Sequence, residues 1–304
     1  MTEKSYQEKC FDEYSKYLTE LFSKAAKNGG FNFVCTILRV SGMELGHWDP
    51  YIEGDQALND YSKLLRKSSG KRLYRLGLLI YCHAVEMSAP YDILLNLIRC
   101  INNKPYKFLP YYELIKKNKK DPFKWSMPYP MSKLEYLRDE AKLAGEERVC
   151  DIIKNFYSND IRNAFYHSDY CLTKKEFRIA EGGSPEIIPL SDISKKFSEC
   201  FAFYSAFAVV LKKFRLSFKK TRKIVKWPNY EVLEILVDEK EGLVGFKVHF
   251  SNDSFAHFER KKDKVFGQNF SIEDEGISLF QGCTDDLKQE WRMNGKRLTD
   301  KDFR

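Results

Sequence analysis

The chain has 304 residues, of which 43% are hydrophobic and 15% aromatic, so its composition excludes a disordered protein and supports a packed core. Its formal net charge of +8 favours a phosphate-bearing partner over an acidic one, but only weakly. The eight cysteines include no Cys-x-x-Cys pair and the five histidines are scattered, which excludes the ligand spacing of a zinc site.

The N-terminal sequence "MTEKSYQEKC" has no apolar segment and is not expected to be a signal peptide. The longest apolar runs, around Leu76–Cys82 and Cys200–Leu211, fall well short of the roughly 20 residues that cross a bilayer. These features predict a cytoplasmic protein with reduced thiols, no membrane partner and no cofactor.

The first hundred residues are expected to be mostly helical. Apolar residues recur at three- and four-residue steps over 1–27, which predicts a helix that ends at Gly29-Gly30. Residues 31–45 form an apolar stretch that fits either a buried helix or a strand. Asp55 is a candidate N-cap for a helix that runs to about Lys67.

The strongest helical pattern runs from about Gly70 to Ile101, with a kink or break expected at Pro90. Residues 102–130 contain five prolines and the sequence "KKNKK", which predicts a long irregular insertion. Two further helices are predicted over about 131–144 and 146–157.

Strands are predicted near Tyr170–Leu172 and Phe177–Ala180, with a short one in "EIIPL", before a long helix to about Phe218 that Ser191 or Asp192 caps. Beyond residue 228 the alternation of apolar residues in twos predicts a small β-rich unit. The expected fold is therefore mainly α, with a short β-hairpin and a β-rich (α+β) C-terminal unit. Its expected parts are a helical extension (1–55), a helical domain (56–222) and the C-terminal domain (223–304).

The most informative stretch is "DIRNAFYHSDY", from Asp160 to Tyr170, which follows two predicted helices and precedes the hairpin. Arg162, the polar Asn163, three residues and His167 are similar to the Arg-polar-xxx-His signature of the HEPN family. The resemblance covers about Gly70 to Phe218, so the two ends of the chain lie outside it and the insertion at 102–130 is not part of the family pattern. It implies a HEPN-like helical bundle with the signature on a late helix.

HEPN nucleases cleave RNA without a metal ion, and the resemblance implies the same chemistry here. In such a reaction the 2′-OH attacks the adjacent phosphate, a base removes its proton and an acid protonates the leaving 5′-oxygen. His167 would act as the acid or base, since imidazole titrates near neutrality. Arg162 would hold the phosphate, because its guanidinium stays charged and matches phosphate oxygens. The resemblance also implies a role as a toxin or antiphage effector.

One chain offers one histidine in this stretch, whereas two chains offer two, which favours a homodimer. Five residues of α-helix turn the side chain by about 500°, so Arg162 and His167 do not share a helical face. Asn163 and His167 do, so Asn163 could orient the ring or hold a phosphate oxygen. Tyr166 could donate a hydrogen bond, and Asp160 is the expected N-cap. The alternative is purely structural: Arg162 pairs with a carboxylate and His167 ends a helix.

Other polar residues have two interpretations each. His83 and Glu86 form His-x-x-Glu on the long helix, where they could support the site, although a histidine on an apolar stripe is usually a core residue. His249 and His257, on C-terminal strands, are expected to be structural or surface residues. "KKNKK" (Lys116–Lys120) could bind phosphate, and more often such a run is solvated. The stronger basic segment holds eight basic residues in fifteen and could track a nucleic-acid backbone or simply end a helix; its candidates are Lys212, Lys213, Arg215, Lys219, Lys220, Arg222 and Lys223.

The function expected from these features is a metal-independent endoribonuclease whose partners are RNA and a second copy of the chain. Two alternatives stay open. One is a non-catalytic HEPN-like module that binds nucleotides or RNA as a sensor. The other is a scaffold whose helical body and C-terminal unit each dock a protein partner.

Overall fold

The computed structural model describes residues 4–40, 50–117, 125–180, 185–227, 230–249 and 255–261, and the short strand segments 264–268, 271–273, 276–278, 292–293 and 296–297. Contacts divide the chain into two compact units. Unit 1 consists of Met1–Lys24, Pro50–Ile98 and Tyr129–Leu211, and unit 2 of Ala25–Asp49, Arg99–Pro128 and Lys212–Arg304. This grouping differs from the three segments expected from the sequence, since part of the N-terminal segment and most of the insertion fall in the same unit as the C-terminal strands.

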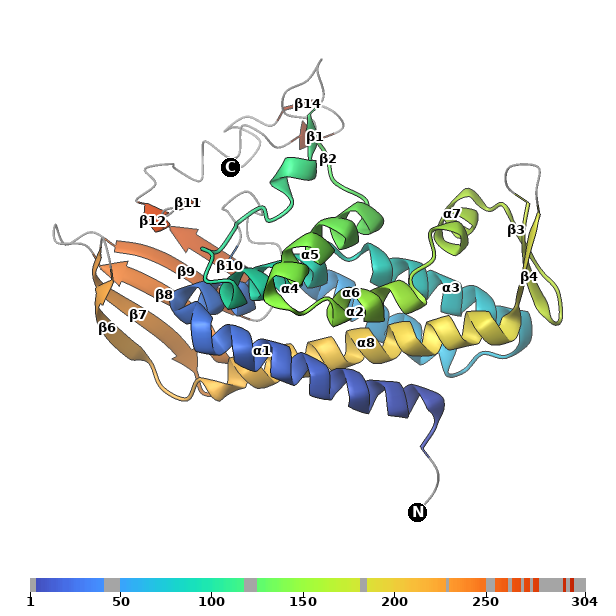
Figure 1. The fold of residues 1–304 in the computed structure, drawn as a ribbon, viewed down its shortest axis with the longest axis horizontal. Coiled ribbons are helices and arrows are strands. Elements are labelled where there is room, and N and C mark those ends of the chain that lie inside the picture. The colour runs from blue at the N-terminus through green and yellow to red at the C-terminus, as the bar shows by residue number, and fades with distance from the viewer. Residues whose placement is uncertain are drawn as a thin grey trace. The chain divides into compact units, whose positions relative to one another are not determined.

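The helices dominate the described chain, which confirms the expected mainly α fold with small antiparallel sheets. The first part of α1 lies alongside α8 in unit 1, where Phe22 and Phe207 meet edge to face with ring centroids 6.1 Å apart (Figure 1). Phe156 and Phe203 extend this aromatic core, with ring centroids 5.6 Å apart. The helices are α1 (Tyr6–Leu38), α2 (Pro50–Leu65), α3 (Gly70–Glu86), α4 (Ser88–Ile101), α5 (Pro130–Ala144), α6 (Arg148–Phe156), α7 (Asn159–His167) and α8 (Leu190–Ser217).

The first helix does not end at Gly29-Gly30, as expected, but changes direction there and continues to Leu38. Gly30 has a φ of 49°, a left-handed conformation that glycine adopts without a steric cost. The stretch after the kink is therefore helical rather than extended, and Phe31 and Phe33 are buried in unit 2. Residues 41–45 of the predicted apolar stretch lie outside the described residues.

The expected break in the long helix is confirmed, at Met87 rather than at Pro90. Met87 has an extended backbone, with φ −60° and ψ 115°, and ends α3. Pro90 lies in the first turn of α4, where a missing N–H leaves no hydrogen bond unmade. The hydroxyl of Tyr91 donates to the Val85 carbonyl (3.2 Å) and ties the two helices together.

The predicted N-caps of two helices are wrong. Asp55 lies inside α2, which begins at Pro50, a residue whose fixed φ suits a first helical position. Ser191 and Asp192 lie in the first turn of α8, which begins at Leu190 directly after Pro189. The true start is thus five residues before Asp55 in α2 and one residue before Ser191 in α8.

The predicted hairpin and the predicted short strand in "EIIPL" both follow α7 and are confirmed as one sheet of three strands. The strands β3 (Tyr170–Leu172), β4 (Glu176–Ile179) and β5 (Glu186–Pro189) pair antiparallel in the order β3-β4-β5. Phe177 is fully buried on this sheet, and its ring stacks on Tyr170 at 5.2 Å. The sheet therefore continues the hydrophobic core past the end of α7.

Unit 2 contains a five-stranded antiparallel sheet in the order β10-β9-β8-β7-β6, which confirms the predicted β-rich unit (Figure 1). Leu233, Val248 and Ala256 lie in register on one buried face of the sheet. The end of α1 packs against this face, where the ring centroids of Phe31 and Phe246 lie 4.9 Å apart. The strands are β6 (Arg222–Trp227), β7 (Tyr230–Asp238), β8 (Gly242–His249), β9 (Phe255–Lys261) and β10 (Lys264–Gln268).

The predicted insertion is irregular, as expected, within its described part. It contains one turn of 3₁₀ helix, η2 (Tyr112–Leu114), and the short paired strands β1 (Lys116–Lys117) and β2 (Trp125–Ser126). Lys119 and Lys120 of the "KKNKK" run lie outside the described residues. Two small hairpins near the C-terminus are formed by β11 (Ser271–Glu273) with β12 (Gly276–Ser278) and by β13 (Arg292–Met293) with β14 (Lys296–Arg297).

The opposite face of the five-stranded sheet carries the two histidines predicted to be structural or surface residues. His249 Nε2 lies 3.1 Å from Glu234 Oε2, and His257 Nε2 lies 3.5 Å from Glu259 Oε2. The His257 side chain is only 14% exposed. Burial and the neighbouring Lys247 charge lower the pKa of His257, against the opposite effect of Glu259 and Glu234.

Lowering the pH is expected to destabilise the protein in part through His257. Because its folded pKa is below the unfolded value of about 6.5, the unfolded chain binds the proton more readily as the pH falls through that value. The melting temperature of a His257→Gln variant should therefore fall less between about pH 7.5 and pH 5.5 than that of the wild type. Circular dichroism melts at both pH values measure this, and an equal fall in both proteins would contradict it.

Candidate active site around Arg162 and His167

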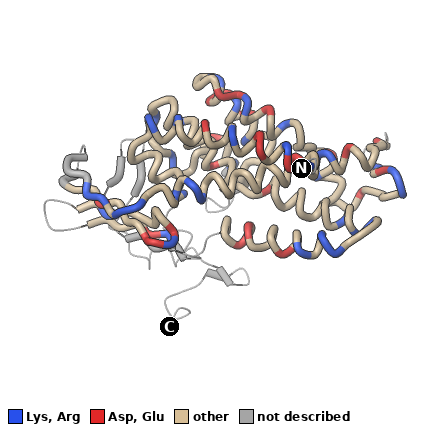
Figure 2. The backbone as a smooth tube through the Cα atoms, turned by 90° about the horizontal axis from the view of Figure 1, so that it is seen from below, with Lys and Arg blue, Asp and Glu red and all other residues tan. Residues whose placement is uncertain are grey.

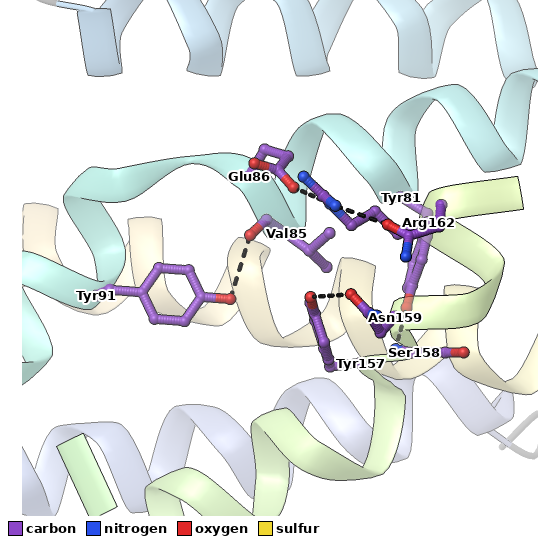
Figure 3. A network of polar contacts seen from close by, with 9 residues as sticks. Tyr81, Val85, Glu86, Tyr91, Tyr157, Ser158, Asn159 and Arg162 are labelled. Atoms are coloured by element: carbon purple, nitrogen blue, oxygen red, sulfur yellow. Dashed lines mark hydrogen bonds and ion pairs between the residues drawn. The ribbon is translucent and has the colours of Figure 1, made fainter. Parts of the chain in front are cut away.

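The signature residues lie on α7, a short helix that a buried tyrosine holds in place. The Tyr81 hydroxyl, from α3, donates to the Phe156 carbonyl at 2.9 Å. It also accepts from the Ser158 N–H at 2.7 Å (Figure 3). Ile161 and Ala164 bury the inner face of α7. The N-cap is Ser158, whose Oγ accepts from the Ile161 N–H at 3.3 Å, so the predicted cap Asp160 is wrong and lies in the first turn. The start of α7 is thus fixed to the core of unit 1.

Arg162 is held by two polar partners on its own and a neighbouring helix. Its Nε donates to Glu86 of α3 in an ion pair (Figure 3), and its Nη1 donates to Asn163 Oδ1 at 2.8 Å. The Arg162 side chain is 17% exposed and that of Glu86 32%. Burial disfavours the charge of Arg162, yet the hydrogen bond and charge of Glu86 outweigh it and raise the pKa of the guanidinium. The arginine is therefore a fixed cation close to the surface.

Two tyrosine rings flank this cation. The guanidinium carbon lies 5.8 Å from the ring centroid of Tyr129 and 5.4 Å from that of Tyr166, within the range of cation–π attraction. Burial, with the nearby Cys82 and Glu86, raises the pKa of Tyr166 to about 12 against the opposite effect of Arg162. Tyr166 is thus a neutral phenol near pH 7 that can donate a hydrogen bond, as the sequence analysis suggested.

His167 is the last residue of α7 and its side chain is exposed. Ser168, with a φ of 61°, ends the helix directly after it. No hydrogen bond or ion pair joins the His167 ring to another described residue, so the expected contact with Asn163 is not formed; Asn163 Oδ1 accepts from Arg162. The helix is regular across the signature, so Arg162 and His167 lie on different faces of it.

His83 and Glu86 belong to different clusters although they share a helix. His83 Nε2 lies 3.2 Å from the Gly54 carbonyl oxygen of α2, and the ring meets Tyr61 edge to face at 6.0 Å. Glu86 instead faces α7 through its ion pair with Arg162. Glu86 is therefore part of the candidate site, and His83 supports the packing of α2 on α3.

Lys133 is a polar residue near the site that sequence reasoning missed. It lies on α5 with only 3% exposure, and its Nζ donates to Ser88 Oγ at 2.8 Å, at the start of α4. Burial lowers its pKa, while Asp92 and Glu86 act in the opposite direction. Its four-residue steps to Leu137 and Ala141, both buried, were the signal that it faces the core.

The basic segment, residues 212–226, is divided between a helix and a strand of unit 2. The structural interpretation had expected only a helix end. The last turns of α8 carry Lys212, Lys213 and Arg215, whereas β6 carries Arg222 and Lys223. Figure 2 shows the basic residues in blue. Lys212, Lys213, Lys219, Lys220, Arg222 and Lys223 are exposed. Arg215 is half-buried and donates to the Leu243 carbonyl (3.2 Å), which gives it a structural role.

Comparison with known proteins adds no information on this site, since no family model, curated protein or solved structure matches the chain. Within the described ranges, no group of three or more His, Cys, Asp and Glu side chains is placed to hold a metal ion. None of the helices in those ranges is both long and apolar enough to cross a membrane.

Proposed function

We propose that the chain is a metal-independent endoribonuclease of the HEPN type that acts as a homodimer. The observation that supports this best is the arrangement of α7, which carries a fixed, tyrosine-flanked arginine and, at its end, an exposed histidine without a partner among the described residues. A histidine that served only packing would make contacts such as that of His83 with Gly54.

The proposed reaction assigns proton transfer to His167 and charge stabilisation to Arg162. A histidine base removes the proton of the 2′-OH, the 2′-oxygen attacks the phosphorus, and the bond from phosphorus to the 5′-oxygen breaks. A histidinium acid gives its proton to that 5′-oxygen, which leaves a 2′,3′-cyclic phosphate and a 5′-OH. Arg162 stabilises the charge on the phosphorane, because its bonds to Glu86 and Asn163 use only two of its five N–H donors.

The dimer follows from the number of histidines. The reaction needs a base and an acid at the same phosphate, and α7 of one chain offers only His167. Two copies of α7 that face one another would supply both groups and two arginines. The role as a toxin or antiphage effector rests on the family resemblance alone.

One observation favours a non-catalytic chain, in which Arg162 has a structural role. Glu86 compensates the charge of Arg162, as in a purely structural ion pair. Binding and catalysis are separated by the experiment below, because only catalysis requires His167 to exchange protons.

The wild-type protein is expected to cut single-stranded RNA in the presence of EDTA and to leave 2′,3′-cyclic phosphate and 5′-OH ends. His167→Ala should lower the rate by at least about a thousandfold, since loss of a general acid–base group costs that order. Its melting temperature should stay within a few degrees, because the side chain is exposed. Labelled RNA on gels, with end-group analysis, measures the reaction. No cleavage by the wild type, or equal cleavage by the variant, would contradict the proposal.

The dimer is tested by mixing. An excess of His167→Ala protein added to a fixed amount of wild type should lower the cleavage per wild-type chain, because mixed dimers contain only one His167. Ser191→Ala protein, altered at an exposed position on α8, serves as the matched addition and should not lower it. If the inactive protein has no greater effect than this control, each chain carries a complete site of its own.

A further inference from the structure

Tyr129 and Tyr166 are large aromatic residues that the fold leaves exposed beside Arg162. Their exposed fractions are 66% and 50%. They come from different elements: Tyr129 directly precedes α5, and Tyr166 lies on α7. Two segments 37 residues apart in the sequence therefore bring an aromatic ring to the same guanidinium (166 minus 129).

These rings contribute little to the core, so their position calls for another explanation. By contrast, Tyr157 and Tyr81 are only 6% and 0% exposed, so these two tyrosines are packed in the core. An exposed ring next to a cation is an arrangement that proteins use to bind single-stranded nucleic acid, because bases stack on aromatic faces and arginine contacts the backbone. The bonds to Glu86 and Asn163 fix the Arg162 guanidinium near both rings, 5.8 Å from the Tyr129 centroid and 5.4 Å from that of Tyr166.

We propose that Tyr129 and Tyr166 form a stacking platform for the bases on either side of the phosphate that Arg162 holds, so that the site accepts single-stranded RNA and rejects duplex. This inference rests on the proposed function for the identity of the phosphate. Bases in a duplex already stack on one another and offer no free face to a tyrosine, whereas unpaired bases do. The platform thus defines the substrate class through base stacking rather than through base-edge hydrogen bonds.

Binding is tested in the His167→Ala background, where the RNA stays intact. A short fluorescent single-stranded RNA is titrated at elevated salt, which weakens contacts made with phosphate alone, and anisotropy is recorded. Tyr129→Leu and Tyr166→Leu should each weaken binding by about tenfold, in keeping with the loss of one stacked base. The Phe variants at both positions should bind like the parent, since they keep the ring.

Tyr6→Leu is the matched control, because Tyr6 is also exposed (46%) and has a cation, Lys195, over its ring at 6.0 Å. It should not change the affinity. The same RNA annealed to its complement should bind at least about tenfold more weakly than the single strand. Leu variants that bind like the parent, a Tyr6→Leu variant that binds as weakly as they do, or a duplex that binds as well as the single strand would overturn the platform.

The outcome separates this inference from the proposed function. If the wild type cuts no RNA but the Leu variants lose binding, the nuclease proposal fails and the platform stands. If the wild type cuts RNA and the Leu variants bind as the parent does, the platform fails and the nuclease proposal stands.

Discussion

Replacing Arg162 by lysine is expected to lower RNA cleavage by about two to three orders of magnitude, the usual cost of losing one preorganised electrostatic contact to a transition state. Lysine keeps the positive charge but has no planar fork, so it cannot hold Glu86 and Asn163 and also reach a phosphate oxygen. The variant therefore tests whether the reaction needs the geometry of the guanidinium or only a positive charge at this position. Initial rates of cleavage of a labelled single-stranded RNA measure the effect.

The structural interpretation makes a different prediction for the same variant. If Arg162 served only to pair with Glu86, Arg162→Lys would cost stability on the order of 1–2 kcal/mol and leave the rate per folded molecule unchanged. The melting temperature and the fraction of folded protein therefore have to be measured with the rate. Cleavage per folded molecule within about threefold of the wild type would contradict a role at the phosphate.

Glu86→Gln is the matched variant, since it keeps the shape of the side chain and removes its charge. It should weaken the hold on Arg162 and leave more net positive charge at the site, so RNA should bind more tightly while the bound RNA is cut more slowly, by about tenfold. A structural pair would change neither quantity beyond the loss of folded protein. Glu86 acts through Arg162, so it is a positioning residue rather than a catalytic one.

The sequence predicted those parts of the fold that depend on periodicity. The helices α5 and α6 and the strands β7, β8 and β9 follow from apolar spacing, because each buries one face along a regular element. The break between α3 and α4 was predicted from Pro90 and lies three residues earlier, at Met87. The N-caps were predicted less well. Asp55, Asp160 and Asp192 have the residue type of a cap, but the preceding turn decides where a helix begins, and that depends on contacts such as Tyr81 with Ser158.

The site was predicted as a set of residues but not as a geometry. The signature located Arg162, Asn163 and His167, and helical rotation already showed that Arg162 and His167 point apart. The ion pair of Arg162 with Glu86 spans 76 residues, so local spacing could not establish it, although Glu86 had been singled out. Tyr129 lies beside Arg162 only because the chain after the insertion returns to α7, a consequence of tertiary packing with no local sequence signal.

A second large effect is expected in unit 2, where Gly242→Ala should destabilise the protein by about 3 kcal/mol or more. Gly242 begins β8 and has a φ of 73°, a left-handed conformation that costs other residues about 1–2 kcal/mol. A Cβ at this position would also lie 2.2 Å from the Arg215 carbonyl oxygen and 2.7 Å from Leu216 Cα, both backbone atoms of α8. Those atoms cannot move alone, because Arg215 Nε donates to the Leu243 carbonyl beside them (3.2 Å).

Gly145→Ala isolates the clash from the strain. Gly145 has a φ of 66° at the end of α5, and a Cβ there would meet no atom within 4 Å, so only the conformational cost of about 1–2 kcal/mol remains. Thermal and urea unfolding of the two variants should therefore differ by about 1–2 kcal/mol or more, with Gly242→Ala the less stable. Hydrogen exchange should show the loss in the amides of β7 and β8, which pair beside Gly242. Equal losses in the two variants would mean that the end of α8 yields to the added methyl group, and that the backbone contact between α8 and β8 does not hold the sheet in place.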